Sequence, residues 1–429
     1  MAPAKTANPC LGQSLEKVTV PTDHWAVQLP WKVSSKSLTA YADHHQHTKV
    51  YDRRTSPPKV TFDEKALAIL NARYHGDPIY GSLVEFREVQ TCKSRYVDGI
   101  LPFIKADGRV MGIFNHNPIT LRLAMKDPML LNLPRIDAED KASVYNLVKE
   151  LYVAEPGYVL AARDYSSIEA KIVGYLANDP NYVRVCDIDA HSFLVSHNIK
   201  EPADLAWSDA DLRTYLAGIK KKHPVQRQGC KKIQHASNYL ATAHKAFLEE
   251  PKLFGSEREA KRLMDLYYSI FPKISDWHKA TCDKVEAQGY ITAPSGFRLY
   301  YADVYAYAYN KTRGGWDKKF GEQAKEAVAG VPQHMGAYYL LGATVRMCER
   351  YPEFSKLIKI LIHDEVMFSA REEEVDVWDQ RLKEVMEEPC EVMPMHAAWG
   401  FGQYMRVATE GKRSIASKDG KWGRWSGMN

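Results

Sequence analysis

The stretch "LIKILIHDEVMFSA" occupies residues 357–370 and carries an acidic pair at the centre of an apolar run. Short apolar runs rich in β-branched residues are typical of buried strands, so the stretch predicts two strands joined at His363-Asp364-Glu365. Burying an unpaired carboxylate costs several kcal/mol or neutralises the group. We therefore expect either a tight turn that exposes Asp364 and Glu365 to water, or a partner for them elsewhere in the chain.

A candidate partner is Asp164, which ends the apolar segment "GYVLAARDYS" (157–166) just before the amphipathic segment "SSIEAKIVGYLAND" (166–179). This pattern predicts a strand followed by a helix, and Ser166 with Glu169 has the spacing of a capping box. Carboxylates from two strands can share Mg²⁺ ions, whose remaining ligands come from substrate phosphates. Two such ions can clamp an in-line phosphoryl transfer. Asp164 with Asp364 therefore favours phosphoryl-transfer chemistry over an ordinary turn.

A second feature is the segment "PVQRQGCKKIQHASNYLATAHK" (224–245), which predicts a helix that begins at Pro224. Arg227, Lys231, His235 and Tyr239 recur every fourth residue and so lie along one stripe of that helix. Two cations suit a triphosphate, and the rings that follow suit a base and a sugar. The alternative is a basic amphipathic helix on the surface, since residues 213–247 contain eight Lys or Arg and no acidic residue.

The rest of the chain is typical of a globular protein, with 45% hydrophobic and 26% charged residues. Seven scattered cysteines without a C-x-x-C pair indicate a reducing compartment. With no apolar run long enough for a bilayer and no signal peptide, we expect a cytoplasmic protein without membrane contact. Residues 1–60 are polar, and their "DHHQH" cluster (43–47) predicts a solvated, partly ordered tail more readily than a metal site.

Helical periodicity covers residues 63–100 and most of 211–285, and another helix is predicted at roughly 320–350. Residues 289–304, "GYITAPSGFRLYYADV", predict a β-hairpin that turns at 294–296. Strands thus flank a long helical segment. The order predicts an α+β fold in which a helical subdomain interrupts a sheet subdomain.

Five segments, in this order, resemble the family A DNA polymerases. They are "DGRVMGIFNHNPITLRLAMKDPMLLNLP" (107–134), "DYSSIE" (164–169), "DAHSF" (189–193), "RQGCKKIQHASNY" (227–239) and "HDE" (363–365). The likeness extends over about residues 65–410. It implies a right-hand fold with an antiparallel-sheet palm, helical fingers and a short helical thumb.

The resemblance also implies domain boundaries. We expect a polar N-terminal extension at 1–60, an abbreviated thumb at 61–105, the palm at 106–172 and 289–429, and the fingers at 173–288. The segment before the palm is too short for a proofreading exonuclease, so we expect a phage-like polymerase module without one. The partners implied are primer-template DNA, dNTPs and, in addition, a separate exonuclease or processivity factor, in a nucleoid-associated enzyme.

Each site residue takes a role from the matched motifs. Asp164 and Asp364 are expected to hold two Mg²⁺ ions, with Mn²⁺ able to substitute, and Lys231 to protonate the leaving pyrophosphate. The residues expected to contact the dNTP are Arg227, Lys231, His191, His235, Tyr239 and Glu169. The residues expected to contact DNA are Arg122, Gln333, His363 and Glu365. Glu169 would exclude a ribose 2′-hydroxyl, a role compatible with the capping box.

The motifs also depart from the family pattern. Ser167 replaces the usual Gln of its motif, Leu121 a Gly, Leu240 another Gly, and His235 a Phe or Tyr. These changes affect contacts to the duplex and the sugar, and leave the metal and triphosphate residues in place. Two alternatives to a template-directed, primer-dependent DNA polymerase remain: a single-subunit RNA polymerase and a non-catalytic DNA-binding relative. The former is less similar, since it lacks the Glu of "SSIE" and has Ser after His-Asp.

Overall fold

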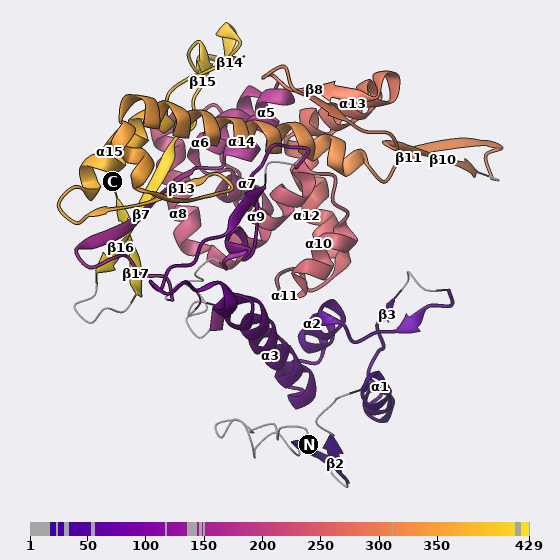
Figure 1. Ribbon diagram of the computed structural model, residues 1–429. Coiled ribbons are helices and arrows are strands. Elements are labelled where there is room, and N and C mark those ends of the chain that lie inside the picture. The colour runs from indigo at the N-terminus through magenta and orange to yellow at the C-terminus, as the bar shows by residue number, and fades with distance from the viewer. Residues whose placement is uncertain are drawn as a thin grey trace. The chain divides into compact units, whose positions relative to one another are not determined.

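The computed structural model describes residues 18–22, 25–29, 34–52, 56–115, 118–134, 144–145, 148, 151–310, 312–416 and 422–428, with side chains from 34 to 413. The chain divides into two compact units. Unit 1 comprises the residues up to Thr91 together with Phe247–Ser256, and unit 2 comprises Cys92–Ala246 and Glu257–Asn429. Figure 1 shows both units and labels many of their elements.

Unit 1 is mainly helical. Its elements are β1 (Val18–Thr22), β2 (Trp25–Leu29), α1 (Ser35–His44), β3 (Tyr51–Asp52), β4 (Lys59–Val60), α2 (Glu64–Arg73), α3 (Pro78–Cys92) and α11 (Pro251–Phe254). The helices α2 and α3 confirm the helical periodicity predicted over 63–100. Their core is formed by Leu67, Leu70, Ile79 and Tyr80, with Phe62 beside them.

The helix α1 corrects part of the predicted N-terminal tail. Ser34 caps it, with the side chain accepting from the amide of Ser37 at 3.1 Å, and Leu38 and Tyr41 are buried in the unit 1 core. The hydroxyl of Tyr41 donates to Asp77 at 2.9 Å. Burial of these two side chains stabilises the helix, although most residues of the segment are polar.

Unit 2 is built on a five-stranded antiparallel sheet. Its strand order is β12 (Ile358–Ile362), β13 (Glu365–Arg371), β7 (Tyr158–Tyr165), β16 (Thr409–Ala416) and β17 (Trp422–Met428). The pairing of β12 with β13 confirms the two strands predicted in the opening stretch. The sheet is completed by β16 and β17, neither of which was predicted.

Helices follow β7 and include the segment 211–285, which was predicted to be mostly helical. They are α5 (Ile168–Leu176), α6 (Pro180–Ile188), α7 (Ala190–Asn198), α8 (Asp209–Lys222), α9 (Pro224–Asn238), α10 (Ala243–Glu249), α12 (Glu257–Ile270) and α13 (Pro272–Gln288). The apolar stripe of α5 packs inward, with Ile168, Ile172 and Val173 buried. Pro224 stands at the start of α9 as predicted.

The other strands of unit 2 form hairpins, and two further α-helices belong to the unit. They are β5 (Ile113–Asn115), β6 (Ala124–Lys126), β8 (Tyr290–Thr292), β9 (Arg298–Tyr300), β10 (Tyr305–Asn310), β11 (Gly315–Phe320), α14 (Ala324–Arg350), α15 (Val375–Met386), β14 (Cys390–Pro394) and β15 (Tyr404–Met405). The predicted hairpin at 289–304 is β8–β9, and Gly296 in its turn has φ +85°. The predicted helix near 320–350 is α14.

The core of unit 2 lies between the sheet and the helices α14 and α15. The alternating side chains of β7 and β13 that face it include Val159, Ala161, Val366 and Phe368. Because side chains alternate along a strand, the intervening residues, among them Asp164, face the other side of the sheet. Among the helices that the structure describes, none is long and apolar enough to cross a membrane.

Candidate active site

The sheet brings together the two carboxylates that the sequence places 200 positions apart. Asp164 lies near the end of β7, directly opposite Glu365 at the start of β13. Asp364 occupies the turn between β12 and β13, and its carbonyl accepts from the amide of Tyr165 at 3.3 Å. The tight turn requires a left-handed backbone at His363, with φ +55°. The structure thus contains both a turn and a partner for the acidic pair.

Asp164 is in an environment that disfavours its own charge. Burial, followed by the negative charges of Asp364 and Glu365, raises the pKa of the Asp164 carboxyl to about 8. Its Oδ1 atom is buried and has no hydrogen-bond partner within the protein. A buried carboxylate oxygen without a partner is costly, and a cation bound at this point would satisfy it.

Glu365 has a partner of its own, which sequence analysis missed. Its carboxylate accepts a hydrogen bond from the ammonium of Lys412, on β16. The same cation acts against the increase in the pKa of Asp164. The charge of Glu365 is therefore balanced by an ion pair within the protein. The Oδ1 atom of Asp164 has no hydrogen-bond partner, so Asp164 is the better candidate of the two for binding a cation.

Glu169 connects α5 with two other predicted site residues. Its carboxylate forms an ion pair with Arg122 and accepts a hydrogen bond from the hydroxyl of Tyr239. The predicted capping box is wrong: the N-cap of α5 is Ser167, in the left-handed region at φ +53°, without a side-chain cap hydrogen bond. Because the Glu169 carboxylate binds Arg122 and Tyr239, it does not accept a hydrogen bond from the backbone at the start of α5.

This cluster lies within the electrostatic influence of Asp364. Burial lowers the pKa of the Arg122 guanidinium, and the charges of Tyr239 and then Asp364 act against this decrease. Burial raises the pKa of Tyr239 well above its usual range, and the charge of Asp364 makes a smaller contribution in the same direction. Three predicted site residues, Arg122, Glu169 and Tyr239, therefore form one connected group near Asp364.

Arg227, Lys231 and His235 lie within the helix α9, so their four-residue spacing places them along one stripe of it. Cys230 and Ile233 are buried beneath it, whereas Lys231 and His235 are exposed. Arg227 forms a bidentate pair with Asp189, with its Nε and Nη2 atoms 3.1 and 3.0 Å from the two carboxylate oxygens. Asp189 also caps α7, a role signalled by its place in "DAHSF" but not identified from the sequence.

His191 lies between Arg227 and the interior of the helical segment. Its Nδ1 atom is 2.6 Å from Oε1 of Gln234, and the Nε2 atom of Gln234 donates to the hydroxyl of Tyr182 at 2.8 Å. That hydroxyl in turn donates to Asn238 at 3.0 Å. Burial and the charge of Arg227 lower the pKa of His191 to about 4, so the imidazole is neutral at pH 7.

The remaining predicted contacts are His235, Gln333 and His363. The ring of His235 packs edge-on against that of Tyr239, with centroids 5.2 Å apart. Gln333 is half-buried on α14, and its neighbour His334 is 3.3 Å from the carbonyl of Thr120, which places α14 beside the segment of Arg122. His363 is exposed next to Asp364.

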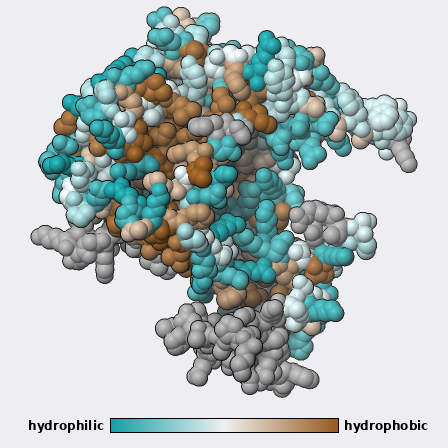
Figure 2. All heavy atoms as spheres, in the orientation of Figure 1, coloured by the Kyte–Doolittle hydropathy of each residue, from teal (hydrophilic) through white to brown (hydrophobic). Residues whose placement is uncertain are grey.

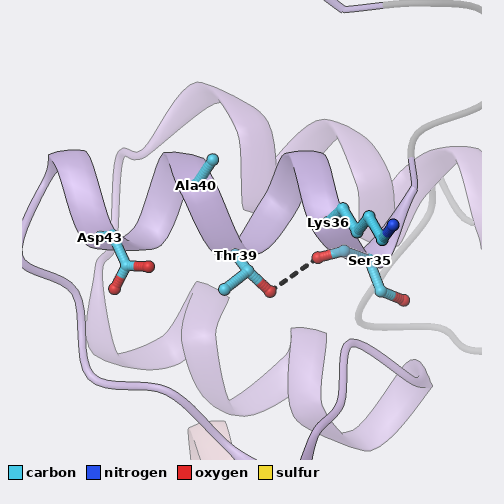
Figure 3. A pocket seen from close by; sticks show the side chains of 5 residues that line it. All are labelled: Ser35, Lys36, Thr39, Ala40 and Asp43. Carbon is cyan, nitrogen blue, oxygen red and sulfur yellow. Dashed lines mark hydrogen bonds between the residues drawn. The ribbon is translucent and has the colours of Figure 1, made fainter.

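Neither a cluster of metal ligands nor the surface depression on unit 1 adds a second candidate site among the described residues. Among the described residues, no group of three or more His, Cys, Asp or Glu side chains could hold a metal ion by itself. A surface depression on unit 1 is lined by Ser35, Lys36, Thr39, Ala40 and Asp43 (Figure 3). The hydroxyl of Thr39 is already bonded to the carbonyl of Ser35 at 2.7 Å, and the depression follows the exposed face of a single helix.

Comparisons with known proteins agree with this geometry. The sequence profile of DNA polymerase family A matches residues 33–406. The chain is 26% identical over 349 residues to the thermostable DNA polymerase I of Thermus aquaticus, covering 80% of this chain and 38% of that protein. It is 25% identical over 338 residues to DNA polymerase I of Mycobacterium bovis, covering 76% of this chain and 33% of that one. The chain thus spans less than half the length of these relatives.

A solved structure has a similar fold. The POL domain of Pol1 from M. smegmatis, in complex with DNA primer-template and dNTP, superposes with a TM-score of 0.66 at 22% identity. The match covers 89% of this chain and 60% of that one. The predicted α+β right-hand polymerase fold is therefore confirmed. Since the family profile matches most of the chain, this protein belongs to DNA polymerase family A.

Proposed function

We propose that this protein is a template-directed, primer-dependent DNA polymerase. The observation that carries the proposal is the meeting of Asp164 and Asp364, with one buried oxygen of Asp164 left without a partner. The helix α9 contributes Arg227 and Lys231 to the same unit, and its C-cap residue Tyr239 lies within the electrostatic influence of Asp364. Such a pair of carboxylates and cations fits a substrate that brings phosphate oxygens of its own.

The metal proposed is Mg²⁺, as two ions for which Mn²⁺ could substitute. The residues present fit it: Asp164 and Asp364 would hold the ions, and Glu365 supports the site while paired with Lys412. When bound, the ions lower the pKa of the primer 3′-hydroxyl and steady the leaving oxygen of pyrophosphate.

The protein's own residues position the nucleotide. Arg227, Lys231 and His191 would contact the triphosphate, and Lys231 would give a proton to the departing pyrophosphate. The rings of His235 and Tyr239 would pack against the sugar and the base pair being formed. In this scheme the primer oxygen attacks the α-phosphate, and the protein contributes mainly positioning and charge stabilisation.

The DNA contacts and domain roles are proposed on the same basis. Arg122, Gln333, His363 and Glu365 would lie along the primer-template, near the primer end. Residues 61–105 would serve as a short thumb, 106–172 and 289–429 as the palm, and 173–288 as the fingers. Further partners, a separate exonuclease or processivity factor, and association with the nucleoid belong to the same proposal.

The test is extension of a labelled primer with dNTPs, rNTPs or dideoxynucleotides in parallel, each with and without Mg²⁺. We expect metal-dependent extension that follows the template and prefers dNTPs. Extension with rNTPs alone would indicate an RNA polymerase, and binding of primer-template without extension would indicate a non-catalytic relative.

Replacing Glu169 should relax the choice of sugar. Arg122 and Tyr239 fix the Glu169 side chain, so a rigid carboxylate would occupy the space that a 2′-hydroxyl needs. We expect Glu169→Ala to raise the rNTP/dNTP ratio of kcat/KM by roughly 10- to 200-fold, the range over which a pocket discriminates one small group.

Two variants control this test. Glu169→Gln keeps the volume and should retain most of the discrimination. Tyr239→Phe removes only the hydroxyl that holds the carboxylate, and should give an intermediate ratio. An unchanged ratio in Glu169→Ala would exclude Glu169 from sugar selection.

A further inference from the structure

The hairpin β10–β11 takes no part in the site described above. It follows β9, precedes α14, and projects away from the helices of unit 2 as an arm (Figure 1). Its sequence, "YAYAYNKTRGGWDKKF" (305–320), interleaves aromatic and basic residues. Several of these aromatic side chains are exposed to solvent, which is unfavourable unless a ligand covers them.

One face of the hairpin collects the aromatic rings. Residues directly opposite each other in an antiparallel pair share a face of the sheet. The three pairs concerned are Tyr305 with Phe320, Tyr307 with Lys318, and Tyr309 with Trp316. Five rings and one ammonium group therefore lie on the same face.

The base of this face is fixed to the protein. The hydroxyl of Tyr305 donates to Asp283 of α13 at 2.7 Å, and Lys318 donates to Glu286 of the same helix at 2.6 Å. The ammonium of Lys318 also lies 3.7 Å from the centre of the Tyr305 ring. These contacts to α13 hold the arm in one direction while its tip extends into solvent.

The tip presents two large rings to solvent. Tyr309 is 55% and Trp316 66% exposed, and their centroids are 5.6 Å apart at an interplanar angle of 72°. Exposed rings on a supported strand pair are suited to stacking with nucleobases, every one of which has a π face. The rings lie in the part of the arm farthest from α13 along the strands.

The charge of the arm favours a polyanion. Its basic residues are Lys311, Arg313, Lys318 and Lys319, and its acidic residue is Asp317. Arg313 pairs with Asp317, and Lys318 with Glu286 of α13, so the excess positive charge of the arm comes from Lys311 and Lys319. The surface of the arm is coloured mostly teal and pale, with few strongly hydrophobic residues (Figure 2). An apolar protein partner would require the opposite composition, since the centres of protein interfaces are depleted in charge.

We propose that the β10–β11 hairpin binds single-stranded DNA, with bases stacking on Tyr309 and Trp316 and the charges of Lys311 and Lys319 attracting the phosphate backbone. The inference rests on the proposed function, because a primer-dependent polymerase meets two unpaired strands. These are the template ahead of the primer end and a strand displaced from it. Both offer the same bases and phosphates to the arm.

The first test measures binding of a fluorescein-labelled oligo-dT by anisotropy, with the full chain and no nucleotide. Tyr309→Ala/Trp316→Ala should weaken binding about tenfold or more, as loss of one or two stacked bases implies. The matched control is Trp207→Ala/Tyr215→Ala, which removes another edge-on Trp–Tyr pair, with centroids 5.2 Å apart. The control variant should bind like the wild type.

Primer extension then distinguishes the two sources of the strand. If the arm holds the displaced strand, the hairpin variant slows only on templates with an annealed downstream strand. If it holds the template, the variant slows on long unpaired overhangs and not on short ones. Unchanged affinity for oligo-dT in the hairpin variant overturns the proposal.

Failure of this inference is separable from failure of the proposed function. Asp164→Asn, which should not extend primers, keeps the arm intact and should bind oligo-dT like the wild type. A chain that binds oligo-dT through the arm but never extends a primer would refute the polymerase assignment alone. A chain that extends primers and whose hairpin variant binds normally would refute the arm alone.

Discussion

Asp164→Asn and Asp364→Asn should each reduce primer extension to below about one thousandth of the wild-type rate. Each variant keeps the shape of the side chain but removes the negative charge that would hold a cation. Charge stabilisation by a bound metal is worth several kcal/mol, and each 1.36 kcal/mol is about tenfold in rate. The measurement is single-turnover incorporation of one dNTP on a labelled primer-template.

Stability distinguishes a loss of chemistry from a loss of folding. The pKa of Asp164 is raised to about 8, chiefly by burial, from an ordinary value of 3.8. A carboxyl with a raised pKa in the folded state costs stability as the pH rises above its unfolded value. At pH 7 without divalent metal, Asp164→Asn should therefore unfold at a higher temperature than the wild type while being inactive.

Two further observations complete this test. Asp265→Asn, which alters an exposed aspartate on α12 paired with Lys261, should extend primers normally. Both active-site variants should still bind primer-template, measured by anisotropy. Either variant retaining a tenth of wild-type extension would remove its aspartate from the catalytic role.

The parts of the site carried by local sequence pattern were predictable. The strand Tyr158–Tyr165, the helix Ile168–Leu176 and the turn at His363 each follow from nearby apolar periodicity. The meeting of Asp164 with Asp364 followed from the order of motifs rather than from any local signal. It depends on antiparallel pairing between segments 200 positions apart, which the structure supplies through β7 and β13.

Contacts that depend on distant partners could not be predicted in this way. Lys412 reaches Glu365 only because β16 pairs with β7, and nothing in its own segment indicates a partner. The capping box at Glu169 failed for a similar reason. Local spacing allowed it, but Arg122, which is distant in sequence, binds the same carboxylate. A long-range ion pair thus overrode a short-range preference.

Arg163 should be among the most sensitive structural positions in unit 2. It precedes Asp164 on β7, faces the buried side of the sheet, and is 1% exposed. Its Nε atom donates to Asp379 of α15 at 2.8 Å, and its Nη1 atom to Thr409 of β16 at 2.9 Å. Arg163→Met should destabilise the fold by about 3–5 kcal/mol, because Asp379 would be left buried and unpaired. Urea denaturation measures the change.

The double variant Arg163→Met/Asp379→Leu shows what the pair contributes beyond stability. Replacing both partners with apolar residues removes the unpaired charge, so most of the lost stability should return. Arg163 and Asp164 are consecutive residues of β7, so their side chains lie on opposite faces of the strand. The ion pair of Arg163 with Asp379 therefore also fixes the strand that carries Asp164. We expect the double variant to fold yet extend primers more slowly, through a lower kcat with an unchanged KM for dNTP. Full activity in the folded double variant would show that the sheet positions Asp164 without this pair, and failure to recover stability would show that the ion pair itself stabilises the fold.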